Sequence, residues 1–144
     1  AHSKNYKENL NIFVVSPSAP IRIENNLIEY ALSKFHNMGL KVTFGSNCFV
    51  DSGNTAGTIK QRVTDIHEGF SNPKFDLIMS TQGGFNSNEL LPFLDYEMIK
   101  NNPKPFCGMS DMTTLCTNLL QKSGIQTFYG LQFRHFTNPD NKDF

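Results

Sequence analysis

Short apolar runs alternate with amphipathic segments along this chain, and this alternation constrains the fold more than any other feature. Residues 11–16 hold a continuous apolar run, which is typical of a strand buried on both faces. The next segment carries apolar residues at helical spacing, namely Leu27, Ile28, Ala31, Leu32 and Phe35. Strands separated by helices need crossover connections, which build a parallel sheet with helices on both faces. The pattern therefore predicts a doubly wound, mostly parallel α/β domain.

The same reasoning places the remaining elements and the loops that join them. We expect strands over 11–16, 41–44, 75–80, 106–109 and 126–129. We expect helices that include 27–35, 59–70, 88–93, 96–100 and 112–122. Ligands on such sheets bind beyond the carboxyl ends of the strands. The candidate functional segments are therefore the loops 16–20, 82–87 and 108–111.

Composition narrows the class of protein. Thirteen basic and thirteen acidic side chains cancel, no cluster of lysine or arginine suggests nucleic-acid binding, and no apolar stretch is long enough to span a membrane. An odd number of cysteines, Cys48, Cys107 and Cys116, favours reduced thiols over a disulfide framework. The polar start of the chain does not resemble a signal peptide. We expect a soluble cytoplasmic protein with no nucleic-acid and no membrane partner.

A serine stands where the fourth predicted strand meets the helix after it. The run Gly108-Met109-Ser110-Asp111 breaks the strand and leads straight into the helix. A hydroxyl at such a turn projects from the end of the sheet, beside backbone N–H groups that can stabilise an oxyanion. Serine is also a favoured residue at a helix N-cap. These residues alone therefore allow either a nucleophile or a simple cap.

A second candidate segment is the glycine loop after the third predicted strand. In Gln82-Gly83-Gly84-Phe85-Asn86, the two successive glycines let the backbone approach a ligand. A tight turn between a strand and a helix also favours glycines, so the loop can equally be a simple turn. Phosphate-binding glycine motifs are absent, and no cysteine and histidine cluster has metal-ligand spacing. We expect no metal and no cofactor. The sequence thus offers a candidate nucleophile without a general base to activate it.

Several motifs together resemble the LD-carboxypeptidase family of serine peptidases, over roughly residues 10 to 130. The matching pieces are Val14-Val15-Ser16-Pro17-Ser18, Gly57-Thr58 to Arg62, the run from Ser80 to Pro92, Leu94-Asp95-Tyr96, Asn102-Pro103-Lys104, Gly108-Met109-Ser110-Asp111 and Thr127-Phe128-Tyr129-Gly130. Two positions depart from the family pattern, because Met109 replaces a common aromatic residue and Leu131 a common proline.

The resemblance implies a Ser-His-Glu hydrolase with Ser110 as its nucleophile. It implies an oxyanion hole made by the backbone N–H groups of Asp111, Gly83 and Gly84. We further expect substrate contacts from Ser16, Phe85 and Asn86. The implied fold is the class I glutamine amidotransferase-like or flavodoxin-like N-terminal domain of a two-domain protein. Its glutamate and histidine would come from a C-terminal domain, so the present chain alone would be inactive.

The resemblance also implies a division of the chain. We expect residues 1–10 to be a disordered or tag-derived flank, residues 11–133 to be the nucleophile domain, and residues 134–144 to begin an interdomain linker. The last segment is polar, lacks periodicity and contains Pro139, as is typical of a linker or a frayed end.

Within the family, the motifs favour one of two branches. The Gly-Phe-Asn-Ser-Asn loop and the Phe-Tyr-Gly ending resemble the microcin C immunity peptidases, which cleave an aminoacyl group from a nucleotide mimic. The other branch removes the terminal D-alanine of murein tetrapeptides. We therefore expect a peptide or an aminoacyl-nucleotide-like small substrate, and the resemblance allows a homodimer. The alternatives are a non-catalytic α/β domain that binds a small molecule and a decoy or interaction module.

Overall fold

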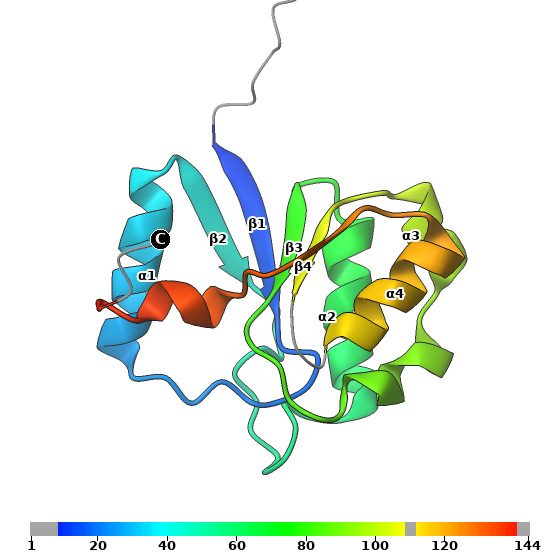
Figure 1. Cartoon of the computed structure of the whole chain (residues 1–144), viewed down its shortest axis with the longest axis horizontal. Helices are drawn as coiled ribbons and strands as arrows, with labels where there is room; N and C mark the ends of the chain where they lie inside the picture. The colour runs from blue at the N-terminus through cyan, green and yellow to red at the C-terminus, as the bar shows by residue number, and fades with distance from the viewer. Residues whose placement is uncertain (1–8, 109–111, 141–144) are drawn as a thin grey trace, which may run out of the picture.

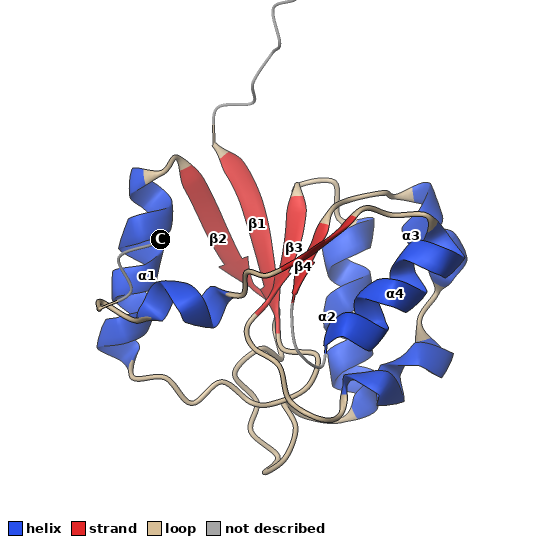
Figure 2. Cartoon of the chain, in the orientation of Figure 1, coloured by secondary structure: helices blue, strands red, loops and turns tan. Residues whose placement is uncertain are grey.

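The computed structural model describes residues 9–108 and 112–140, which form a sheet of five strands between two helical layers (Figures 1 and 2). The elements in chain order are β1 (Leu10–Val15), α1 (Asn25–Asn37), β2 (Leu40–Phe44), α2 (Ile59–Ser71), β3 (Leu77–Ser80), η1 (Ser87–Phe93), α3 (Tyr96–Asn101), β4 (Phe106–Gly108), α4 (Met112–Ser123), β5 (Thr127–Tyr129) and η2 (Phe133–Thr137). The elements η1 and η2 are 3-10 helices. The predicted α/β fold is confirmed.

The order of the strands fixes where a ligand can enter. The sheet has the order β2-β1-β3-β4-β5, and every neighbouring pair is parallel. After β1 the chain goes to one side of the sheet for β2, and then it crosses to the other side for β3. In such sheets the crevice for a ligand lies at this switch point, beyond the carboxyl ends of β1 and β3. The loops that follow these two strands lie together at the lower end of the molecule in Figure 1.

Alternate residues of β1 divide the apolar core into two layers. Phe13 and Val15 face the layer that α2, α3, α4 and η1 cover, whereas Ile12 and Val14 face α1 and η2 (Figure 1). This division follows from the period of two in a strand, whose successive side chains point to opposite faces. The apolar run from Ile12 to Val15 is therefore buried on both faces of the sheet, as the sequence predicts.

Helix α2 begins and approaches the sheet through specific local contacts. At its start, the Gln61 N–H donates to Thr58 Oγ1 at 3.1 Å, and the Thr58 N–H donates to Gln61 Oε1 at 2.9 Å. This reciprocal pair satisfies two of the N–H groups that a helix leaves unpaired. Near the other end, a Cβ on Gly69 would stand 2.8 Å from Phe13 and 2.9 Å from Ile78. The missing side chain lets α2 lie close against β1 and β3.

The end of the chain differs from the expected polar tail. Residues 133–137 form η2, in which Phe133 and Phe136 are buried against α1. The two rings lie 5.9 and 4.4 Å from the ring of Phe35. The spacing of three residues puts both phenylalanines on one face of the short helix, while the charged residues between them mask the pattern in the sequence. This short helix packs on the core just past residue 133, while the predicted division of the chain into domains stays a prediction.

No helix in residues 9–108 and 112–140 is both long and apolar enough to cross a membrane.

Truncation of Phe136 tests whether this terminal helix belongs to the core. Phe136 is 6% exposed, so Phe136→Ala should lower the free energy of unfolding by about 3–5 kcal/mol through lost burial and a residual cavity. Urea denaturation followed by circular dichroism measures the change. The control is Phe128→Ala, because Phe128 is largely exposed and should contribute much less. Equal losses in both variants would show that η2 does not pack as described.

Candidate active site

The carboxyl ends of β1, β3 and β4 lie side by side, because β3 pairs with β1 on one side and with β4 on the other. The predicted nucleophile Ser110 and its neighbour Asp111 lie outside the described residues. Their flanks are described: β4 ends at Gly108, and α4 begins at Met112. The Gly108 carbonyl accepts a hydrogen bond from the Gly130 N–H at 3.1 Å. The chain therefore enters this segment from a strand that is paired on both sides.

The glycine loop after β3 carries backbone donors at this edge. In the described part of the chain, the N–H groups of Gly83 and Gly84 have no hydrogen-bond acceptor. Gly84 packs directly on the loop after β1, where an added Cβ would collide with the Ser18 hydroxyl and lie 2.9 Å from the Ala19 nitrogen. Only glycine fits this close approach. The arrangement can present N–H groups to a substrate oxygen.

The loop after β1 offers acceptors rather than donors. The Pro17 carbonyl accepts from Arg62 Nη1 at 3.1 Å, and the Ser18 carbonyl accepts from the Ala56 N–H at 2.9 Å. The Pro20 carbonyl accepts from Gln82 Nε2 at 2.6 Å. Because proline has no N–H, Pro17 and Pro20 cannot contribute the backbone donors that a phosphate loop uses.

Ser16, for which we predicted a contact with substrate, has its hydroxyl bound within the protein. Ser16 is only 4% exposed, and its hydroxyl donates to the Cys48 carbonyl at 2.8 Å. The same oxygen lies 2.9 Å from Thr81 Oγ1. These bonds join the loops after β1, β2 and β3 beneath the edge. Burial also raises the pKa of the Cys48 thiol to about 12, so Cys48 stays a neutral member of this network.

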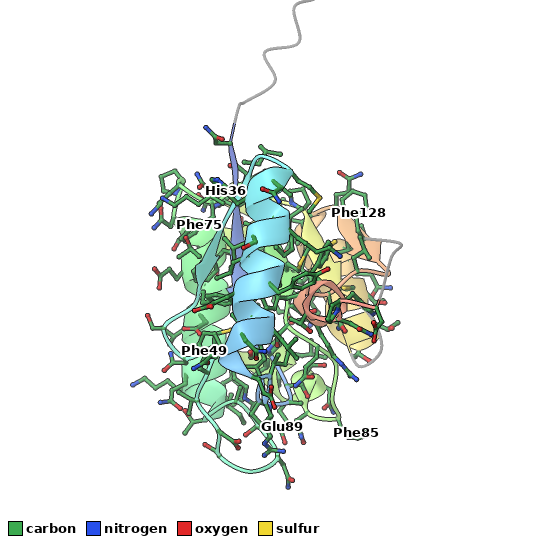
Figure 3. The ribbon with its side chains drawn as sticks, turned by 90° about the vertical axis from the view of Figure 1, so that its left-hand side faces the viewer. His36, Phe49, Phe75, Phe85, Glu89 and Phe128 are labelled. Atoms are coloured by element: carbon green, nitrogen blue, oxygen red, sulfur yellow. The ribbon has the colours of Figure 1, made fainter. Side chains whose placement is uncertain are left out.

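The other two predicted contact residues occupy the rim of the site. Phe85 is 93% exposed and stands at the lower end of the molecule, far from His36 (Figure 3). Asn86 has both backbone groups bound: its N–H donates to Ser18 Oγ at 2.9 Å, and its carbonyl accepts from Arg62 Nη1 at 3.2 Å. The backbone of the glycine loop is thus fixed just after an aromatic side chain that remains open to solvent.

Arg62 is a structural part of the site that the residue patterns did not single out. It lies on α2 and is 3% exposed, and its guanidinium pairs with Glu89 Oε2 at 3.0 Å. Its position falls within the apolar face formed by Ile59, Val63 and Ile66. An arginine on the buried face of a helix indicates a cation that is paired inside the protein, because burial of an unpaired charge is costly. The sequence contains this indication, but it does not identify the partners of Arg62.

A hollow of about 430 Å³ opens beside the two loops. It is lined by Ala19, Pro20, Arg22, Ile23, Gly53, Asn54, Gln82 and Arg134. Arg22 Nε donates to Asp51 at 2.7 Å, and this bond lowers the pKa of Asp51 to about 2. Arg134 adds a second cation to the wall. The hollow is large enough for part of a small ligand; Asp51 offsets the charge of Arg22, so Arg134 is the cation that favours an anionic group there.

Two of the three histidines in the described residues accept backbone hydrogen bonds. His67 Nε2 accepts from the Asp95 N–H at 2.9 Å, and His135 Nδ1 accepts from the Gln132 N–H at 3.0 Å. Burial lowers the pKa of His67, which keeps the ring neutral and able to accept. No group of three or more metal-ligating side chains is found within residues 9–108 and 112–140. What the described site offers is backbone donors and a cationic hollow.

Substitution of Gly84 tests the close approach of the two loops. Gly84→Ala should lower the free energy of unfolding by about 1–3 kcal/mol, because the added methyl group overpacks against Ser18 and Ala19. Nuclear magnetic resonance should show displaced amide signals at both residues. The control Gly124→Ala lies in open space at the end of α4, and it should leave those signals unmoved. Unchanged signals in Gly84→Ala would contradict the described packing.

Comparison with known proteins agrees with this geometry. The LD-carboxypeptidase N-terminal domain family matches residues 12–130. The microcin C7 self-immunity protein MccF of Escherichia coli is 37% identical over 123 residues, which are 85% of this chain and 36% of MccF. The murein tetrapeptide carboxypeptidase of Pseudomonas aeruginosa is 25% identical over 120 residues, 83% of this chain and 38% of that enzyme.

Solved structures give the same result. A crystal structure of an MccF-like protein from Bacillus anthracis superposes with a TM-score of 0.88 at 36% identity, over 94% of this chain and 41% of that one. MccF in complex with aspartyl sulfamoyl adenosine superposes with a TM-score of 0.85 at 37% identity, over 91% of this chain and 40% of that one. This chain spans well under half the length of these relatives. It belongs to the LD-carboxypeptidase family, and it corresponds to the N-terminal domain of that family.

Proposed function

We propose that this chain is the nucleophile-bearing domain of a serine peptidase that hydrolyses an amide bond in a small aminoacyl-nucleotide-like substrate. One observation carries the proposal: the loops after β1 and β3, together with the flanks of the Ser110 segment, meet at the carboxyl edge of the sheet. Gly83 and Gly84 bring backbone donors to this edge. Membership of the LD-carboxypeptidase family gives this arrangement its chemistry.

In the proposed reaction, the Ser110 hydroxyl attacks the carbonyl carbon of the substrate amide while a histidine takes its proton. The carbonyl oxygen becomes an oxyanion that the N–H groups of Asp111, Gly83 and Gly84 stabilise. The intermediate collapses when the histidine returns the proton to the leaving nitrogen, and an acyl-enzyme remains. Water then attacks the acyl-enzyme with the histidine again as base, which releases the acid and restores the serine.

The histidine and its glutamate partner would come from a second domain of a longer protein. The chain covers about 40% of the MccF and MccF-like structures, which leaves room for such a domain. His67 and His135 already accept backbone hydrogen bonds within this domain. Members of a triad act as a unit, so the chain alone should lack turnover.

The hollow and its rim favour a substrate with an anionic part and a flat ring. Arg22 and Arg134 line the hollow together with Gln82, and Phe85, three residues further along the same glycine loop, offers an exposed ring for stacking or apolar contact. MccF has been solved with an aminoacyl sulfamoyl adenosine, and the present chain is more similar in sequence to MccF than to the murein enzyme. A murein tetrapeptide is the alternative substrate.

We also propose a cytoplasmic location, which the three unpaired cysteines favour, and a homodimer.

The decisive experiment uses the longest protein that contains this chain. It is incubated separately with aspartyl sulfamoyl adenosine and with a murein tetrapeptide, and products are followed by mass spectrometry. We expect cleavage of the first substrate, and we expect Ser110→Ala to lower kcat by at least about 10⁴-fold while the protein stays folded.

The other outcomes separate the alternatives. Cleavage of the tetrapeptide alone, lost in Ser110→Ala, would assign the chain to the murein branch. Binding of either compound without turnover, unchanged in Ser110→Ala, would favour a non-catalytic binding domain in which Ser110 only caps α4. Neither binding nor turnover would leave an interaction module.

A further inference from the structure

Arg62 is the one lysine or arginine side chain that is buried among the described residues. Its side chain is 3% exposed, so it cannot touch a substrate. Burial of a guanidinium is costly unless every donor finds an acceptor. The acceptors around Arg62 therefore indicate what its burial accomplishes.

Those acceptors belong mainly to the two loops that form the candidate site. Arg62 Nη1 donates to the Pro17 carbonyl at 3.1 Å and to the Asn86 carbonyl at 3.2 Å. Pro17 lies in the loop after β1, and Asn86 lies in the glycine loop after β3. One nitrogen atom on α2 thus connects two segments that are 69 residues apart in the sequence.

The remaining donors of Arg62 fix the guanidinium itself. Nη2 donates to Glu89 Oε2 at 3.0 Å, and Nε lies 3.4 Å from the Thr58 carbonyl at the start of α2. Glu89 belongs to η1, just after the glycine loop, and stands at the same lower end of the molecule as Phe85 (Figure 3). The planar fork of arginine is suited to this set of acceptors, and the single ammonium of a lysine is not.

The glycine loop needs such a contact because its own residues do not restrict it. Gly83 and Gly84 have the widest choice of backbone angles, so the direction of their N–H groups depends on what holds the ends of the loop. At Asn86, the N–H is held by Ser18 and the carbonyl by Arg62. The peptide groups that flank Asn86 are thereby bound on both sides.

We propose that Arg62 is a positioning residue, which orients the oxyanion-stabilising N–H groups of the glycine loop through Nη1, the donor to the Pro17 and Asn86 carbonyls, while Nη2 and Nε hold the guanidinium in place. The effect of Arg62 on catalysis rests on the proposed function. The effect of Arg62 on the conformation of the glycine loop does not depend on that function. A displaced oxyanion donor weakens stabilisation of the transition state more than binding of the ground state. Loss of Arg62 should therefore act on kcat and leave KM nearly unchanged.

The test compares Arg62→Met with the matched control Lys60→Met in the longest protein that contains this chain. Lys60 is an exposed cation on the same helix and has no part in the site. Hydrogen–deuterium exchange by mass spectrometry follows peptides that cover residues 82–90 and, as a reference, β1. In Arg62→Met we expect at least about tenfold faster exchange in the loop with little change in β1, and a kcat lowered about 10- to 100-fold with KM within about threefold.

Two further variants keep the test decisive if Arg62→Met does not fold. Arg62→Lys retains the charge without the fork, and Glu89→Gln weakens the ion pair at a half-exposed position. Both should accelerate exchange in the loop and lower kcat in the same direction as Arg62→Met, by smaller factors. Wild-type exchange and wild-type kcat in every folded variant would overturn the proposal, as would a rise in KM alone.

The two readouts also separate this inference from the proposed function. If the wild-type protein shows no turnover, the proposed function fails while exchange in the loop still decides whether Arg62 fixes it. If turnover is present and only exchange changes, Arg62 fixes the loop without a role in catalysis, which contradicts the proposal.

Discussion

The connection between the loops after β1 and β3 is the constraint on which the candidate site depends. Pairing of β1 with β3 brings the starts of these two loops together, but in a doubly wound sheet the chain then leaves the switch point in different directions, so side chains must hold the loops against each other beyond the strands. Here the Ser18 hydroxyl, the Gln82 amide and the Arg62 guanidinium all bridge the two segments. Gly84 completes the contact, because its missing side chain lets the backbones meet.

The two connected loops contribute different hydrogen-bonding groups to the site. The first loop contains two prolines and contributes carbonyl acceptors to its neighbours, whereas the N–H groups of Gly83 and Gly84 have no acceptor among the described residues. The loop after β1 thus supports its neighbour, and the glycine loop contributes hydrogen-bond donors. The cationic hollow beside them, with Arg22 and Arg134, adds a place for an anionic group. In the reaction that we propose, this domain supplies oxyanion stabilisation and substrate contacts, while a second domain supplies the proton transfer.

Sequence reasoning predicted the fold and the placement of the loops because these depend on local periodicity. The continuous apolar run of β1 and the helical spacing in α1 each indicate burial without knowledge of partners. What it missed depends on contacts between distant segments. The residue patterns did not reveal that the Ser16 hydroxyl bonds to the Cys48 carbonyl and lies against the Thr81 hydroxyl beneath the edge. Phe136 was assigned to a polar tail because its partner, Phe35, lies about a hundred residues earlier. Arg62 carried a signal only in its position on an apolar helix face.

The most direct measurement of the central claim is a crystal structure of the Ser110→Ala variant, within the longest protein that contains this chain, bound to aspartyl sulfamoyl adenosine. The account predicts that the aspartyl carbonyl oxygen accepts hydrogen bonds from the glycine loop, with its carbon facing position 110 and the anionic part of the ligand toward Arg134. A ligand bound elsewhere, or a carbonyl oxygen directed away from Gly83 and Gly84, would contradict it.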